Sequence, residues 1–216
     1  PLTIGVIPTI APYILPDLLS MLAEAYPDLQ PRFVEEQTQH LITRLRNGNL
    51  DLAIMALPSE ATGMVDSPLY TEKFSIVCPP DHPIAGREDV ELAELKDLDL
   101  LLLDDGHCLR DQVVDLCRHA NINPAEATNS VTRASSLTTI MQLVMGGLGC
   151  TLVPESALAT ECHGKDVAVA HFAPDVTAER EVGLVFRSSA ARAEEFREFG
   201  TLITSAYNKA IERSRQ

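Results

Sequence analysis

Short apolar runs alternate with segments whose apolar residues recur at helical spacing in the first part of the chain. Apolar runs of strand length occupy residues 2–7, 31–35 and 50–57. In residues 12–25 and 38–46 the apolar side chains recur every three or four positions, which places them on one face of a helix. This strand–helix–strand–helix–strand order predicts a parallel sheet with right-handed crossovers.

The alternation restarts in the second part of the chain and ends in a long amphipathic segment. Glycine and proline separate the expected elements. Strands are expected at residues 74–78, 100–103, 130–133, 150–154, 167–171 and 181–186, and helices at residues 90–96, 137–145, 155–160 and 191–213.

The pattern divides the chain into two α/β lobes of similar size. The chain is expected to cross between them near Pro79 and again near Phe186. Lobe I would then comprise residues 1–79 and 187–216, and lobe II residues 80–186.

Composition sets the broad class of the protein. Hydrophobic residues make up 45% and charged residues 22% of the chain, which supplies a core and argues against disorder. The formal net charge of −14 argues against this chain itself gripping phosphate backbones or an anionic membrane surface. No apolar stretch approaches the roughly 20 residues of a membrane span. The chain starts at Pro1 rather than Met, so we expect a fragment or a processed form.

Five cysteines are spread through the chain. An odd and sparse set is untypical of a secreted disulfide scaffold, so a reducing cytoplasm is the expected location. The sequence has no C-x-x-C pair and no paired histidine run, so it indicates no zinc site. Cys78 and Cys150 fall at expected strands and should be core residues, whereas Cys162, beside His163, is expected to be exposed.

Cys108 and Cys117 form the most informative pair, nine positions apart within residues 104–117. Cys108 falls at an expected strand-to-helix turn, where unpaired backbone N–H groups stabilise a thiolate. On one helix the two residues would be about 13 Å apart, whereas a disulfide needs Cα atoms within about 7 Å. The pair therefore cannot bridge while the segment is helical, and oxidation would have to refold it. The alternative is that both are small buried hydrophobes.

The polar neighbours of Cys108 each admit two interpretations. His107 could polarise the site, or it could be a turn residue with a satisfied backbone contact. Arg110 adds a fixed positive charge near the thiol. An ion pair between Arg110 and Asp111 could orient the loop, or it could be a solvated surface pair of little energetic value.

Two hydroxyl residues follow the first two expected strands. Thr9 and Thr38 lie where α/β folds hold ligands, beyond the carboxyl ends of parallel strands. A hydroxyl both donates and accepts hydrogen bonds, which suits a small neutral ligand. Thr38 could equally be the N-cap of its helix, and Thr9 a turn residue.

Five segments, in the same order along the chain, carry a resemblance to a known family: IGVIPT at residues 4–9, EQT at 36–38, DGHCLRDQ at 105–112, ASSL at 134–137 and GLVFR at 183–187. With them, the chain resembles the effector-binding domain of LysR-type transcriptional regulators, and within these the hydrogen-peroxide-sensing OxyR branch. The general family pattern is loose. The sequence Gly-His-Cys-Leu-Arg-Asp-Gln, with a second cysteine nine residues after the first, is close to diagnostic of that branch.

The resemblance implies an α/β fold of two Rossmann-like lobes joined by two crossing strands, like a type 2 periplasmic-binding protein. It implies that the winged helix-turn-helix DNA-binding domain, N-terminal in this family, is absent from this chain, so DNA would be bound only through that part. In the family two such domains pack side by side and full-length regulators form tetramers. A homodimer in a bacterial cytoplasm is therefore expected.

The resemblance also implies roles for individual residues. Cys108 would be the peroxidatic cysteine, which hydrogen peroxide oxidises to a sulfenic acid, and Cys117 the resolving cysteine that closes a disulfide. No metal or cofactor is implied. The peroxide pocket would comprise Thr9, Thr38, His107, Arg110, Asp111 and Arg187.

The implied mechanism is a switch. The disulfide would refold residues 103–120, rearrange the oligomer and change the transcription of antioxidant genes, and a glutathione-, glutaredoxin- or thioredoxin-type reductant would reset it. Such a protein would be a sensor and not an enzyme. Two alternatives stay open: a metabolite-sensing effector domain whose cysteines are incidental, and a thiol peroxidase that turns over repeatedly.

Overall fold

A parallel β-α-β-α-β arrangement opens the chain, as the apolar pattern predicts. The computed structural model describes residues 1–129 and 131–216. Strand β1 lies between β2 and β3 and is parallel to both. The elements are β1 (Leu2–Val6), α1 (Ala11–Ala25), β2 (Pro31–Glu35), α2 (Thr38–Arg46) and β3 (Leu52–Leu57).

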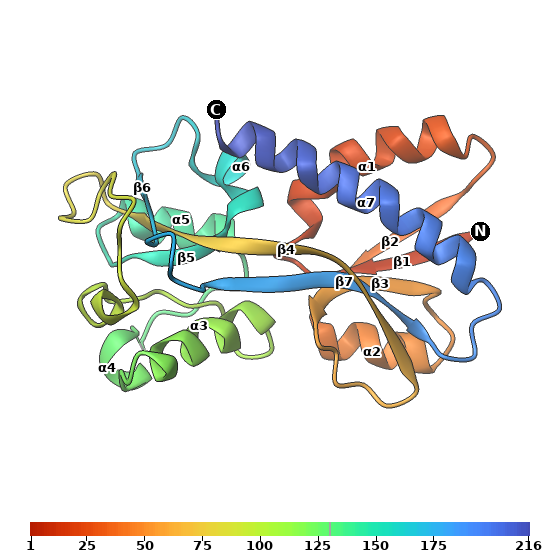
Figure 1. Ribbon diagram of the computed structural model, residues 1–216, viewed down its shortest axis with the longest axis horizontal. Helices are drawn as coiled ribbons and strands as arrows, with labels where there is room; N and C mark the ends of the chain where they lie inside the picture. Colours follow the sequence, from red (N-terminus) through yellow and green to blue (C-terminus); the bar gives the residue numbers. More distant parts are fainter. Residues whose placement is uncertain (130) are drawn as a thin grey trace. The chain divides into compact units, whose positions relative to one another are not determined.

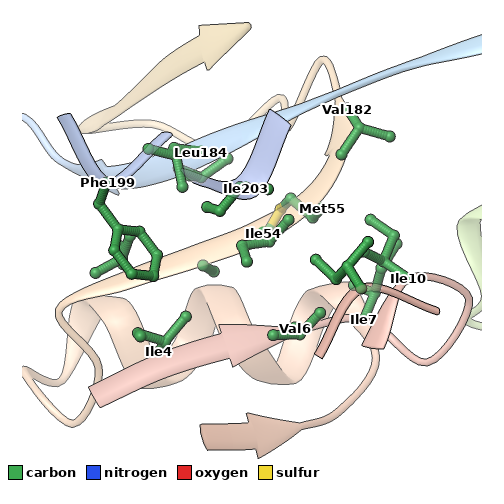
Figure 2. Close-up of a cluster of buried hydrophobic side chains, with 14 of the residues drawn as sticks. Ile4, Val6, Ile7, Ile10, Ile54, Met55, Val182, Leu184, Phe199 and Ile203 are labelled. Carbon is green, nitrogen blue, oxygen red and sulfur yellow. The ribbon is translucent and has the colours of Figure 1, made fainter. Parts of the chain in front are cut away.

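Two elements from the end of the chain complete this first unit. Strand β7 (Glu179–Arg187) pairs with β3 in antiparallel orientation, so the sheet is mixed where a purely parallel one was predicted. Helix α7 (Ala193–Ser214) packs alongside α1, and α2 covers the other face of the sheet (Figure 1). The core between them is apolar, with side chains such as Ile4, Ile54 and Phe199 meeting from β1, β3 and α7 (Figure 2). Burial of this apolar surface is the main stabilising force of the unit.

The second unit is built around the end of strand β4 (Met64–Cys78). Both β5 and β6 pair with that end in antiparallel orientation. The other elements are η1 (Leu92–Asp97), α3 (Cys108–His119), α4 (Pro124–Ala127), α5 (Leu137–Met145), β5 (Thr151–Pro154), η2 (Glu155–Ala157), α6 (Leu158–Cys162) and β6 (Ala168–His171).

Two expected strands of the second unit differ in the structure. Residues 100–103 contribute only single bridges, from Leu100 to Thr128 and Cys150 and from Leu103 to Ala134. Of the strand expected at residues 130–133, residue 130 lies outside the described residues, and residues 131–133 are not in a strand. Residues 100–103 make too few neighbouring bridges to form a ladder.

The boundaries between the two units lie at other residues than those expected for the lobes. The first unit comprises Pro1–Glu72 and Arg180–Gln216, and the second comprises Lys73–Glu179. The crossings expected at residues 79–80 and 186–187 each lie seven residues after the boundaries that the structure has. The reason is that β4 and β7 are long strands that run on through the crossing, so Pro79 marks the end of β4 and not the boundary between units. No helix within the described residues is long and apolar enough to cross a membrane.

Candidate functional site

The turn before α3 places Cys108 at the first position of that helix. Gly106 has a φ of 96°, a left-handed conformation that glycine adopts without steric cost, and His107 is the extended N-cap residue. The backbone N–H of His107 donates to the carbonyl of Asp104 at 3.4 Å, and that of Arg110 donates to the carbonyl of His107 at 3.1 Å. Cys108 is therefore the first residue of a twelve-residue helix, at the end where the backbone N–H groups lack helical partners.

The two cysteines of α3 are held apart by the helix that contains both. Cys108 is half-buried, whereas Cys117 is 0% exposed, and burial raises the pKa of the Cys117 thiol. Both are thiols, and no disulfide occurs among the described residues. Nine helical steps separate them by about 13 Å, beyond the roughly 7 Å that a disulfide allows. The sequence prediction that the helix keeps the pair apart is confirmed.

Arg110 orients the turn through partners other than the expected one. Its Nη1 donates to the carbonyl of Leu103 at 2.9 Å, and its Nε lies 3.1 Å from a carboxylate oxygen of Asp105. The expected ion pair with Asp111 is replaced by this pair with Asp105. Asp111 is exposed in the first turn of α3, where its negative charge favours the helix.

His107 and Asp104 bring unsatisfied polar atoms to the same turn. His107 is 4% exposed, and burial lowers the pKa of its imidazole, an effect that the nearby Asp104 charge partly opposes. Neither His107 Nε2 nor Asp104 Oδ1 has a hydrogen-bond partner among the described residues. Buried polar groups are normally hydrogen-bonded, so these two atoms leave hydrogen-bonding capacity unused inside the turn. Sequence reasoning missed Asp104; its position directly before Asp105-Gly106 was the available signal.

Thr9 and Thr38 belong to the first unit and follow β1 and β2, as expected. Both are buried. Thr38 is the first residue of α2, and Gln37 is the N-cap, so the N-cap alternative for Thr38 is wrong by one position. The residues around Cys108 belong to the second unit, and a peroxide pocket that combines both groups stays a prediction.

Arg180 is the residue that sequence reasoning missed in the first unit. Its guanidinium is fully buried and lies 2.9 Å from a carboxylate oxygen of Glu72, which is equally buried. It also donates to the hydroxyl of Thr9 at 2.8 Å. The signal was the period-2 alternation of β7, in which Arg180 shares the buried face with Val182, but the expected strand began at residue 181, two residues after the start of β7.

Arg187 is the last residue of β7, at the opposite end of that strand from Arg180. Its Nη1 donates to the carbonyls of Leu45 and Leu50, the latter at 2.8 Å. These carbonyls precede β3, whereas Thr9 follows the carboxyl end of β1, which is parallel to β3. The structure therefore does not bring Arg187 together with Thr9 and Thr38. Arg187 instead links the end of α2 to the segment before β3 through these two hydrogen bonds.

The remaining cysteines are buried. Cys78 and Cys150 are core residues, as predicted. The prediction of an exposed Cys162 is wrong, because this residue, the last of α6, is only 7% exposed. Burial raises the pKa of Cys150 and that of Cys162 to about 12. No cluster of three or more metal-ligating side chains occurs among the described residues.

Comparison with known proteins gives consistent matches over nearly the whole chain. The family model described as LysR substrate binding domain matches residues 1–207. A protein of Mycobacterium avium named "Probable hydrogen peroxide-inducible genes activator" is 48% identical over 200 residues, which are 93% of this chain and 63% of that protein. The Escherichia coli "DNA-binding transcriptional dual regulator OxyR" is 40% identical over 189 residues, 87% of this chain and 60% of that protein.

Solved structures agree. A hydrogen-peroxide-bound mutant of Corynebacterium glutamicum OxyR is 59% identical with a TM-score of 0.97, covering 100% of this chain and 67% of that one. The oxidised form of the same protein is 60% identical with a TM-score of 0.89, covering 100% of this chain and 66% of that one. The chain thus spans less than two thirds of the length of the curated relatives, 63% and 60% of the two named above.

Proposed function

The chain belongs to the family of LysR substrate-binding domains and has its periplasmic-binding-protein-like α/β fold, and from this we propose that it is the peroxide-sensing regulatory domain of a LysR-type transcriptional regulator. The observation that carries the proposal is the placement of two thiols on α3. Cys108 is half-buried at the first position of the helix, and Cys117 is fully buried nine residues later. The helix keeps one thiol reactive and the other out of reach.

The first chemical step is the oxidation of Cys108. Its thiolate attacks one oxygen of hydrogen peroxide, the O–O bond breaks, hydroxide leaves, and the sulfur becomes a sulfenic acid. Cys108 is the first residue of α3, and Arg110 lies in the same helical turn with its guanidinium paired to Asp105. His107 directly precedes Cys108, burial holds its imidazole toward the neutral form, and we assign to it the transfer of a proton in this step.

The second step changes the fold. The Cys117 thiol attacks the sulfenic sulfur, water leaves, and a disulfide forms. Because the intact helix holds the residues about 13 Å apart, α3 must open first, and residues 103–120 refold. We infer that this refolding alters a homodimer of this domain within a tetrameric regulator.

The regulator would bind DNA through a winged helix-turn-helix domain outside this chain. Its output would be the transcription of antioxidant genes. A dithiol reductant of the glutaredoxin or thioredoxin type returns two electrons and two protons and restores both thiols.

The two alternatives are less well supported. A thiol peroxidase would have to open and reform α3 at every turnover, and the matched family is one of transcriptional regulators. A metabolite sensor with incidental cysteines would need no helix that separates two thiols. The likeness to Corynebacterium glutamicum OxyR supports the switch, because the TM-score is 0.97 to its peroxide-bound mutant and 0.89 to its oxidised form at nearly equal identity.

Intact-mass analysis with peptide mapping, after about one equivalent of hydrogen peroxide, tests the proposal. The wild type should lose two hydrogens in a Cys108–Cys117 linkage. The Cys117→Ser variant should stop at a sulfenic acid on Cys108, and the Cys108→Ser variant should not react. A linkage through Cys78, Cys150 or Cys162, or no linkage, would overturn it.

A further inference from the structure

A cavity of about 440 Å³ lies in the second unit along one face of α3. A volume of this size is in the range of small-molecule sites, which run from about 300 to 1,000 Å³. The lining comes from β4, η1, α3, the first residue of β7 and the segment before it. The lining residues are Phe74, Leu92, Gln112, Asp115, Leu116, His119, Thr177 and Glu179.

The wall of the cavity is apolar and aromatic, and its polar groups offer acceptors. Phe74, Leu92 and Leu116 supply hydrocarbon surface. The Oε1 atom of Gln112 is buried and has no hydrogen-bond partner among the described residues. An unsatisfied buried acceptor is costly. Because Oε1 has almost no accessible surface, the Gln112 side chain would turn its amide toward the cavity to accept a hydrogen bond from a ligand.

Two carboxylates add negative charge at this cavity. Glu179 is exposed and makes no ion pair within the part of the chain that the structure describes. Among residues 1–129 and 131–216, Asp115 makes one ion pair, with Arg118 at 3.7 Å, and both side chains are largely exposed, so the pair is weak. His119 uses its Nδ1 in a 2.7 Å contact with the carbonyl of Asp115. The set therefore favours a ligand with N–H donors and a positive charge.

We propose that this cavity binds a small organic amine with an apolar body. The apolar or aromatic part packs between Phe74, Leu92 and Leu116. The ammonium group donates to Gln112 Oε1 and lies near the carboxylates of Asp115 and Glu179. A carboxylate of the same shape should bind more weakly, because it would be repelled by the two carboxylates and has no N–H donor for Gln112. A neutral alcohol should also bind more weakly, because it lacks the positive charge.

The cavity and the thiol pair share one helix. Gln112, Asp115, Leu116 and His119 are spaced as one face of α3, which also contains Cys108 and Cys117. The cavity exists only while this segment is helical. On the proposed function, disulfide formation requires the helix to open, so an amine that binds the helical form holds the domain in its thiol state. The amine would raise the level of peroxide needed to switch the protein.

Binding can be measured without any redox chemistry. The chain contains no Trp, so the indole emission of tryptamine can be followed directly against the reduced protein. Tryptamine should bind at least tenfold more tightly than tryptophol, its neutral analogue, and more tightly still than indoleacetate. Glu179→Gln should abolish most of the preference for the amine. Glu181→Gln, an exposed acid on the same strand outside the cavity, should leave it unchanged. Equal binding of the three probes, or none, would overturn the site.

Coupling to the switch needs a second readout. At ten times its dissociation constant, tryptamine should slow Cys108–Cys117 disulfide formation roughly tenfold, because only about one molecule in eleven is then unliganded. It should leave sulfenic acid formation in Cys117→Ser unchanged, which excludes direct consumption of peroxide by the amine. Tight binding with an unaltered disulfide rate would overturn the coupling. Absence of the disulfide without any amine would instead refute the proposed function, and the binding data would still decide the site.

Discussion

Arg180 donates two hydrogen bonds to Thr9, one to its hydroxyl oxygen at 2.8 Å and one to its carbonyl oxygen at 3.1 Å. The same guanidinium donates twice to one carboxylate oxygen of Glu72, and both ionised side chains are fully buried. Because the Thr9 hydroxyl accepts from a cation, its own proton is polarised and directed toward another acceptor. A residue adjoining the boundary between the units thus fixes the loop after β1.

Replacing Arg180 with Ala should destabilise the protein by about 3–5 kcal/mol, because the buried Glu72 carboxylate would lose the positive charge of the guanidinium. The free energy of unfolding, measured in urea, gives the loss. The matched control is Arg32→Ala on β2, an exposed arginine whose loss should change stability by no more than about 0.5 kcal/mol. Equal effects of the two substitutions would contradict the buried pair.

The five thiols should differ sharply in their rate of alkylation by iodoacetamide in the native protein. Cys108 is half-buried at a helix start, whereas Cys150 and Cys162 are buried with pKa values of about 12. Near pH 8 only about one in ten thousand of such buried thiols is ionised. Peptide mapping over time should find Cys108 modified first and all five modified in urea. Modification of Cys162 at the same rate as Cys108 would show that Cys162 is not buried in solution.

The pH dependence of stability should carry a contribution from His107. Burial lowers the folded-state pKa of this imidazole below its usual 6.5. As pH falls below about 6.5, the unfolded chain takes up a proton that the folded chain does not, so stability falls until the pH passes the lowered folded pKa. His107→Gln should therefore lose less stability than the wild type between about pH 7.5 and 5.5. The exposed His163→Gln should follow the wild type.

Weakening α3 should accelerate the disulfide without a change in the chemistry of Cys108. Val114 lies in the middle of the helix and is half-buried. Glycine costs a helix interior about 1 kcal/mol relative to alanine, so Val114→Gly should close the disulfide about fivefold faster than Val114→Ala. Stopped-flow mixing with peroxide and quenched mass analysis give the two rates. Identical rates would mean that helix opening does not limit the reaction.

Arg187 should act in stability and not in peroxide chemistry. Its guanidinium donates to two backbone carbonyls between α2 and β3. Arg187→Met should cost about 2 kcal/mol in unfolding free energy. The rate of Cys108 oxidation should stay within about twofold of the wild type, since the change is worth less than about 0.4 kcal/mol at the barrier. A large fall in that rate would restore Arg187 to the peroxide pocket.

Local sequence patterns were enough to predict the bounds of elements that bury a regular apolar face. Helix α5 and strand β2 have the predicted bounds because each carries its own apolar periodicity and its own stop signal. The first half of β4 was not predicted. It is polar, only partly buried and contains Pro68, which argues against a strand, and its strand conformation depends on neighbours that are distant in sequence.

One such contact between residues distant in sequence is the close approach of β7 to β4. A Cβ atom on Gly183 would lie 2.4 Å from the carbonyl oxygen of Ser67, so only glycine permits this contact. Within the site, the position of Cys108 at the start of a helix follows from sequence. The partners of Arg110 and Arg180 do not, because they are set by which residues tertiary folding brings together.

The first unit is assembled from two separated stretches of chain, whereas the second is one continuous stretch between them. A nascent chain emerging from the ribosome would therefore present the whole second unit before β7 and α7 exist to complete the first. At roughly five to twenty residues per second, that delay is on the order of ten seconds. The half-built first unit would expose its apolar sheet face throughout this interval, so a chaperone would find its target in residues 1–72, while the thiol-bearing unit could already be folded.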